Sequence, residues 1–169
     1  MQIHLVQKLF SAAVCLTLLF LSGCASFLVP EVGTLAREDA RIALDDSGVQ
    51  NAVWQAKDLK LDYSIDIVGN ELVISGRLRF DRSLTDSYNV TKSFFLKMSF
   101  IDDRGQVLET VDITPLVKQY GSNTGTFDVK RKFEMSPGTS GIVFNNYGVF
   151  RGEPPEAGDD ISILYFPYE

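Results

Sequence analysis

Apolar and polar residues recur with a period of two along most of the chain after residue 58. Every second residue from Leu59 to Ile67 is apolar, and the alternation resumes between Glu71 and Phe80 after Gly69-Asn70. Successive side chains of a strand point to opposite faces, so this pattern predicts a hairpin with one buried face and a two-residue turn. Gly76 interrupts the second run, where a close neighbour or a bulge is expected.

The same period predicts five further strands. They cover residues 93–101, 106–113, 127–135, 142–150 and 161–168. The first two are expected to form a second hairpin around Asp102-Asp103-Arg104-Gly105. Short strands without alternating helices predict a mainly β fold, an antiparallel immunoglobulin-like sandwich of about seven strands, with a closed barrel as the alternative.

The pattern before residue 58 is different. Thr34 is a suitable N-cap residue and alanines recur on one side of the segment that follows, so a short N-terminal helix is expected to about Leu44. Further upstream, Lys8 precedes a run of about 13 mostly apolar residues, which suits a signal peptide and is too short for a membrane span.

Leu21-Ser22-Gly23-Cys24 directly follows this run and resembles the lipobox of bacterial lipoproteins. The resemblance implies cleavage before Cys24 and lipidation of its thiol, and two or three acyl chains anchor a protein stably in a membrane. Ala25 after the cysteine resembles the outer-membrane default of two-membrane bacteria. The expected location is therefore the periplasmic face of the outer membrane.

Three segments follow from these signals. Residues 1–23 are expected to be a cleaved signal peptide, and residues 24–33 a lipidated tether that reaches at most about 30 Å. Residues 34–169 are expected to form a single β-sandwich domain that includes the N-terminal helix. A domain of this size buries an ordinary core without disulfides.

The inventory of reactive side chains narrows the chemistry. His4 is the only histidine and lies with Cys15 in the expected signal peptide, so the mature chain keeps only Cys24. This excludes zinc sites of the His/Cys kind, Ser-His-Asp triads and internal disulfides. The sequence has no phosphate-binding or calcium-binding loop motif. We therefore expect no catalytic residue, no metal site and no cofactor, and predict that the protein is not an enzyme.

Charge argues against two classes of partner. The chain has 16 Lys and Arg against 22 Asp and Glu, and loss of Lys8 with the signal peptide leaves a net charge of −7. This sign disfavours binding to nucleic acid and to anionic lipid surfaces. The lipid on Cys24 is expected to provide the membrane attachment.

Met98-Ser99-Phe100-Ile101-Asp102, followed by Gly105 and Val107, resembles the FxLYD module, an immunoglobulin-like domain of bacterial envelope proteins. The similarity spans about residues 71–113. Met, Phe and Ile stand where that motif has Phe, Leu and Tyr, so the shared features are the strand pattern and the aspartate. The resemblance supports a sandwich and assigns no functional residue.

Two local features are candidate binding sites. Residues 145–158 combine aromatic residues with a Pro-rich loop, which either binds a partner or only connects the last two strands. The candidate contacts there are Asn146, Tyr147, Phe150, Arg151, Pro154 and Pro155. Glu109 and Arg131 fall on the apolar sides of their strands. They are either a partly buried pair or groove, or the signs of a bulge and of a side chain that reaches solvent at a sheet rim.

These features favour a non-catalytic envelope lipoprotein that binds another protein or supports an assembly, for example by strand addition at a sheet edge. A second hypothesis is binding of cell-wall glycan through exposed aromatic residues: Trp54, Tyr120 and Tyr147. Core packing is the alternative for Trp54. A third is a carboxylate-dependent hydrolase. Its candidate pairs lie in expected turns, where Asp is common for local hydrogen bonding: Asp102-Asp103 and Asp159-Asp160.

Overall fold

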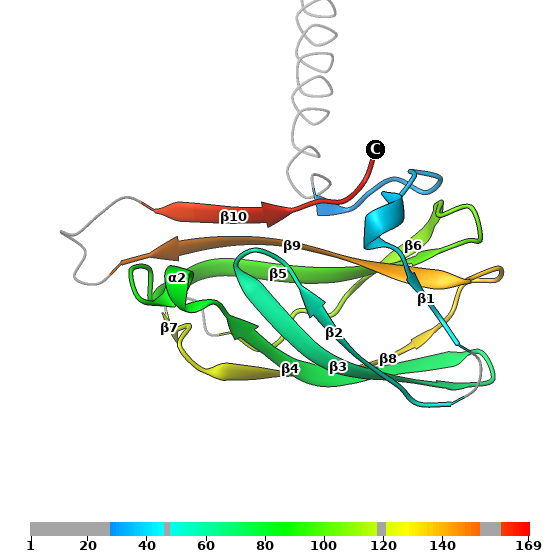
Figure 1. Cartoon of the computed structure of the whole chain (residues 1–169), viewed down its shortest axis with the longest axis horizontal. Helices are drawn as coiled ribbons and strands as arrows, with labels where there is room; N and C mark the ends of the chain where they lie inside the picture. Colours follow the sequence, from blue (N-terminus) through cyan, green and yellow to red (C-terminus); the bar gives the residue numbers. More distant parts are fainter. Residues whose placement is uncertain (1–27, 46–47, 118–120, 153–159) are drawn as a thin grey trace, which may run out of the picture.

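The computed structural model describes residues 28–45, 48–117, 121–152 and 160–169, which form two antiparallel sheets packed face to face (Figure 1). The first sheet has the order β1-β9-β5-β6, with β10 also paired to β9 and β7 to β5. Its strands are β1 (Ile42–Ala43), β5 (Val90–Ile101), β6 (Val107–Asp112), β7 (Gly121–Ser122), β9 (Gly141–Arg151) and β10 (Ile161–Tyr165). The second sheet, in the order β2-β3-β4-β8, contains β2 (Gln50–Gln55), β3 (Leu59–Val68), β4 (Glu71–Phe80) and β8 (Thr126–Glu134).

The predicted mainly β, antiparallel sandwich is confirmed. The seven expected strands are present as β3, β4, β5, β6, β8, β9 and β10, and the described residues contain three more, β1, β2 and β7. In Figure 1, β9 and β10 lie at the top of the molecule, while β3, β4 and β8 lie at the bottom.

The alternating pattern accounts for the hairpin of β3 and β4. Ile65 pairs with Ile74 across the two strands, and both are buried. Gly69 has a φ of 63°, which the two-residue turn requires. Gly76 pairs with Tyr63, and a Cβ atom at Gly76 would lie 2.9 Å from the Cβ of Tyr63. The close neighbour expected at Gly76 is therefore present.

Both sheets contribute aromatic side chains to the core between them. Phe80 of β4 contacts Phe94 of β5 and Phe150 of β9, with ring centroids 4.9 and 5.1 Å apart. Trp54 of β2 contacts Phe144 of β9 at 5.2 Å. Burial of each side chain of this size stabilises the fold by about 1.5–3 kcal/mol, and the tilted and edge-on contacts link the two sheets.

The helix expected over residues 34–44 is absent, apart from a 3₁₀ turn at Glu38–Ala40. Ala36 forms an isolated bridge with Tyr168, and β1 then pairs with β9. Ala36 and Ala40 are buried in a small second core on the outer face of the first sheet. Pairing with distant segments and this burial outweigh the modest helix propensity of the segment.

The loop after β4, expected to be polar and irregular, contains the short helix α2 (Arg82–Thr85). The carboxylate of Asp81 accepts a hydrogen bond of 2.8 Å from the backbone N–H of Ser83. This is the usual contact of an N-cap residue, and it explains where the helix begins.

Part of the expected tether lies against the sandwich. The carbonyl of Leu28 accepts a hydrogen bond of 2.9 Å from Nδ2 of Asn145, and the N–H of Gly33 donates to the carbonyl of Val107 at 2.8 Å. Cys24 precedes Leu28 by only four residues. Within the described part of the chain, no helix has the length and apolar character needed to cross a membrane.

Candidate functional site

Residues 145–151 of the predicted partner-binding stretch lie in β9, which pairs with β10 on one side and β5 on the other. Asn146 and Phe150 point toward the core and are 2% and 0% exposed. The expectation that they contact a partner is therefore wrong, because β9 is paired on both sides and both side chains are buried on its inner face. Tyr147 and Arg151 face outward and are half-buried. The remaining candidates lie outside the described residues: Pro154 and Pro155.

Tyr147 is the middle of a row of apolar side chains that crosses three strands. It pairs with Phe95 of β5 on one side and with Leu164 of β10 on the other, and directly paired residues point to the same face of a sheet. Phe95 is 41% exposed and Leu164 is 53% exposed. We call Phe95, Tyr147 and Leu164 the apolar row. Large apolar side chains gathered in this way on a sheet face are typical of a contact surface.

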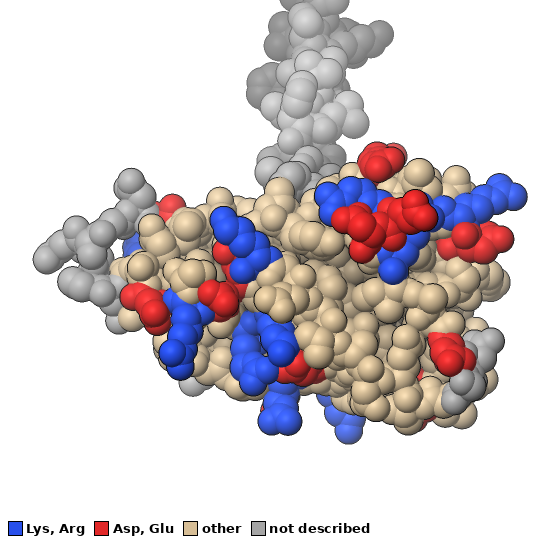
Figure 2. All heavy atoms as spheres, in the orientation of Figure 1, with Lys and Arg blue, Asp and Glu red and all other residues tan. Residues whose placement is uncertain are grey.

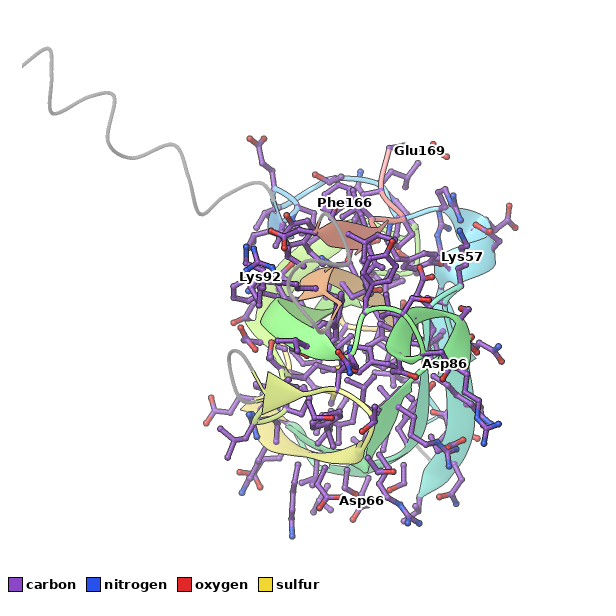
Figure 3. All side chains as sticks on the ribbon, turned by 90° about the vertical axis from the view of Figure 1, so that its left-hand side faces the viewer. Lys57, Asp66, Asp86, Lys92, Phe166 and Glu169 are labelled. Carbon is purple, nitrogen blue, oxygen red and sulfur yellow. The ribbon has the colours of Figure 1, made fainter. Side chains whose placement is uncertain are left out.

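Phe166 extends the exposed apolar surface beyond the end of β10. It lies two residues after Leu164 and is 37% exposed. Figure 3 shows it at the top of the sandwich, beside β10. Its ring centroid lies 4.9 Å from that of Tyr168 in the same C-terminal segment.

The first described residues of the chain cross the same face. Asn145, two residues before Tyr147 in β9, donates from Nδ2 to the carbonyl of Leu28, and its Oδ1 accepts a hydrogen bond of 3.5 Å from the hydroxyl of Tyr168. Residues two apart in a strand are about 7 Å apart. Leu28 is therefore hydrogen-bonded to the residue that precedes Tyr147 on the same face of β9. The next residue, Val29, is 39% exposed.

A cluster of charged side chains lies at the start of β10. Asp160 accepts hydrogen bonds from Nε of Arg151 at 2.8 Å and from Nζ of Lys92 at 2.5 Å; Lys92 is labelled in Figure 3. The hydrogen bonds from Arg151 and Lys92 hold the pKa of the Asp160 carboxyl below its usual value. The predicted contact residue Arg151 is therefore part of an ion pair within the chain.

Glu109 and Arg131 do not form the buried pair that their positions suggested. Glu109 is exposed and accepts a hydrogen bond of 2.8 Å from Oγ of Ser136. Arg131 donates from Nη2 to the carbonyl of Thr114 at 2.7 Å and from Nη1 to the carbonyl of Lys130 at 2.9 Å. The register of β5 and β6 shifts beside Glu109. The alternative of a bulge is confirmed beside Glu109, and Arg131 lies in the edge strand β8.

A shallow groove of about 730 Å³ lies on the outer face of the second sheet. Its lining includes the small residues Ser64, Ser75 and Gly76, and the two serine hydroxyls are 3.0 Å apart. Charged residues of both signs complete it: Asp62, Arg77, Asp128 and Lys130. Figure 2 shows basic and acidic side chains next to each other along the lower edge of the molecule, where Figure 1 places strands of this sheet. Such a lining suits a polar binding partner.

Of the aromatic residues considered for glycan binding, the two that the structure describes, Trp54 and Tyr147, lie in different sheets. Trp54 is 8% exposed, and its ring contacts those of Phe144 and Tyr165 at 5.2 and 5.6 Å. Core packing, the alternative for Trp54, is therefore confirmed. Tyr120 lies outside the described residues, and Tyr147 belongs to the apolar row.

Two of the four carboxylates considered for hydrolysis, those of Asp102 and Asp160, are engaged in local contacts. Oδ1 of Asp102 accepts hydrogen bonds from the backbone N–H groups of Arg104 and Gln106 at 3.0 and 2.8 Å, which confirms its role in the turn. Asp160 is held by the charged cluster, and its neighbour Asp159 lies outside the described residues. Within the ranges that the structure describes, no three His, Cys, Asp or Glu residues are grouped so that they could hold a metal ion.

The sequence analysis named Tyr147 but missed Phe95 and Leu164, the other two residues of the apolar row, although the sequence carries a signal for them. Phe95 stands between Phe94 and Leu96, and Leu164 stands between Ile163 and Tyr165. In each case an apolar residue occupies the strand face that alternation assigns to solvent. Comparison with known proteins does not extend this picture: no family model, curated protein or solved structure matches the chain.

Proposed function

We propose that the chain is a lipoprotein of the bacterial cell envelope, anchored through Cys24 at the periplasmic face of the outer membrane, whose sandwich binds a partner protein without catalysis. One observation carries the proposal. Leu28 is hydrogen-bonded to the surface of the sandwich, four residues after the lipobox-like cysteine. Four residues reach at most about 14 Å. A lipid on Cys24 would therefore hold the sandwich directly at the membrane surface.

The contacts of Asp102 and Asp160 support a non-catalytic role. Hydrolysis of a glycosidic bond needs two carboxyl groups that face a substrate, one of them with a raised pKa. Asp102 instead accepts two backbone hydrogen bonds in its turn. The pKa of Asp160 is lowered by its hydrogen bonds with Arg151 and Lys92.

For the partner protein, the groove on the second sheet is the surface that we favour. It lies on the outer face opposite the one that carries Leu28, so a membrane-held sandwich would present it away from the lipid. Its mixture of Asp62, Arg77, Asp128 and Lys130 suits another protein, because interfaces of transient complexes are about as polar as the rest of a protein surface.

Metabolic labelling with palmitate in a two-membrane bacterium tests the anchor. The wild type and Cys15→Ala should incorporate label and sediment with membranes, because Cys15 lies in the expected signal peptide. Cys24→Ala should lose both properties. Label in the Cys24→Ala protein, or its absence from the wild type, would contradict the proposed anchoring.

Photo-crosslinking in living cells tests the partner surface. A photoreactive residue at position 51, 64 or 130 of the groove should give one dominant protein adduct that mass spectrometry identifies. The control position is Glu109, which is exposed at the edge of the first sheet and should give no such adduct. Adducts to glycan alone, or none at any groove position, would refute the role of this surface.

A further inference from the structure

We infer that the apolar row is a contact surface for the lipid bilayer itself. Phe95, Tyr147 and Leu164 would rest in the interface of the membrane that holds the chain, and this contact would fix the orientation of the sandwich. The inference rests on the lipid attachment at Cys24 proposed above. It adds a second, non-covalent contact, so that the sandwich lies on the membrane with one defined face.

The length of chain between the cysteine and the sandwich selects this face. Cys24 can lie at most about 14 Å from Leu28, and Leu28 is bonded to Asn145 on the outer face of the first sheet. Two packed sheets are about 10 Å apart, and the side chains on both outer faces add to this thickness. A segment of four residues cannot pass around the sandwich to the outer face of the second sheet. Of the two outer faces, only that of the first sheet can meet the lipid.

The side chains on this face suit the membrane interface. Aromatic rings prefer the headgroup level, and binding of a protein surface to lipid strengthens with the apolar area that it buries. Phe95 and Leu164 are 41% and 53% exposed, at either end of the row. Val29 and Phe166, at 39% and 37% exposed, add apolar surface beside Leu28 and beyond β10.

Electrostatic attraction to lipid is not the basis of this contact. The mature chain has a net charge of −7. On the same face, Nζ of Lys97 lies 3.4 Å from Asp112, and Asp160 pairs with Lys92 and Arg151. Because these basic side chains already have acidic partners, we expect the contact to depend little on salt or on the proportion of anionic lipid.

Photo-crosslinking to lipid tests the contact between the apolar row and the bilayer directly. The lipidated mature chain is purified from membranes and placed in vesicles of phosphatidylethanolamine and phosphatidylglycerol, with p-benzoylphenylalanine at position 95 or 164. Position 53 is the matched control, because Val53 is 56% exposed on the outer face of the second sheet. Phospholipid adducts are expected at 95 and 164 and should be lost at 53. Adducts to a second copy of the chain, or no excess over position 53, would overturn the inference.

A second measurement separates docking from simple tethering. The probe is placed at position 166, and its lipid adduct is compared in two double variants. Phe95→Ser with Leu164→Ser should lose most of the adduct. Val53→Ser with Val68→Ser removes exposed apolar side chains from the second sheet and should retain it. An equal yield in both variants would mean that the anchor alone brings this face to the lipid. That result would overturn the inferred contact of the apolar row with the bilayer.

The acyl groups on each sample are measured by mass spectrometry. Acylated protein that gives no lipid adduct at positions 95 and 164 would overturn the inferred bilayer contact and leave the proposed anchor intact. Protein that carries no acyl group on Cys24 would overturn the proposed lipid attachment, and with it the inferred bilayer contact.

Discussion

The hydroxyl groups of Ser99 and Tyr168 lie 2.7 Å apart, although the two residues are 69 positions apart in the sequence. Ser99 is fully buried, and its hydroxyl also lies 2.7 Å from that of Thr110. Tyr168 bridges Ala36 and packs against the small second core. This contact therefore joins the C-terminal segment, and through its bridge the residues around Ala36, to one face of the first sheet.

The buried Tyr168 predicts a loss of stability at high pH. Burial raises its pKa from 10.0 to about 12, although the hydrogen bond with Ser99 opposes the shift. The unfolded chain thus releases this proton at a lower pH than the folded chain. The stabilisation is complete below pH 10 and is lost as the pH rises to about 12, a change of about 2–3 kcal/mol.

Urea unfolding of the wild type and of Tyr168→Phe checks this prediction, at pH values of about 8, 10 and 12. The wild type should lose its advantage in unfolding free energy over the variant as the pH rises. A constant difference between the two proteins would show that Tyr168 does not titrate differently in the folded state.

Truncation of two aromatic residues of β9, Phe150 and Tyr147, should change the stability of the fold by very different amounts. Phe150 is 0% exposed and contacts Phe80, so Phe150→Ala leaves a cavity and should lower the free energy of unfolding by about 3–5 kcal/mol. Tyr147 lies on the outer face and is half-buried, so Tyr147→Ala should cost about 1 kcal/mol or less. Similar losses in urea unfolding would contradict the assigned directions of these side chains.

Much of the fold could be predicted because one face of each long strand is buried. The alternation from Leu59 to Phe80 fixed both the hairpin and its turn, as the pairing of Ile65 with Ile74 shows. The strands β1 and β7 have only two residues each, and in β2 the consecutive apolar residues Ala52, Val53 and Trp54 obscure the alternation. The helix expected after Thr34 failed for another reason, because pairing of Ala36 with Tyr168 is a contact over more than 130 residues.

The candidate site was less predictable, because it depends on contacts between distant segments. Asn145 and Asn146 lie in a strand that the sequence predicted, but their polar side chains gave no sign that they are buried. Both are nearly fully buried, and the partners of Asn145, the carbonyl of Leu28 and the hydroxyl of Tyr168, come from the two ends of the described chain. The apolar row likewise needs the register of three strands, which places Phe95, Tyr147 and Leu164 side by side.

Gly76 should tolerate no side chain. A Cβ atom there would overlap the carbonyl oxygen of Asp62 and lie 2.9 Å from the Cα of Tyr63. Gly76→Ala should therefore lower the free energy of unfolding by about 1–3 kcal/mol. Gly125→Ala is the matched control, since its Cβ would meet nothing within 4 Å, and it should be neutral or slightly stabilising. Equal midpoints of urea unfolding for the two variants would refute the close approach at Gly76.

Arg131 and Glu109 should contribute independently to stability. Arg131→Met removes the hydrogen bonds to the carbonyls of Thr114 and Lys130 and should cost about 1–2 kcal/mol. Glu109→Gln affects an exposed group and should change stability by about 0.5 kcal/mol or less. In a double-mutant cycle the coupling energy should fall below about 0.5 kcal/mol. A larger coupling would restore the paired arrangement that the sequence suggested.

The adjacent aspartates of the β5–β6 turn should differ in the same way, because only one of them organises the backbone. Asp102 accepts hydrogen bonds from the N–H groups of Arg104 and Gln106, so Asp102→Ala should lower the free energy of unfolding by about 1–2 kcal/mol. Asp103 is exposed, and Asp103→Ala should stay within about 0.5 kcal/mol of the wild type. Amide hydrogen exchange gives the more specific readout. The amide of Gln106 should exchange faster in Asp102→Ala, and its exchange rate should be unchanged in Asp103→Ala. If both variants accelerated exchange equally, the carboxylate of Asp102 would not be the group that holds the turn.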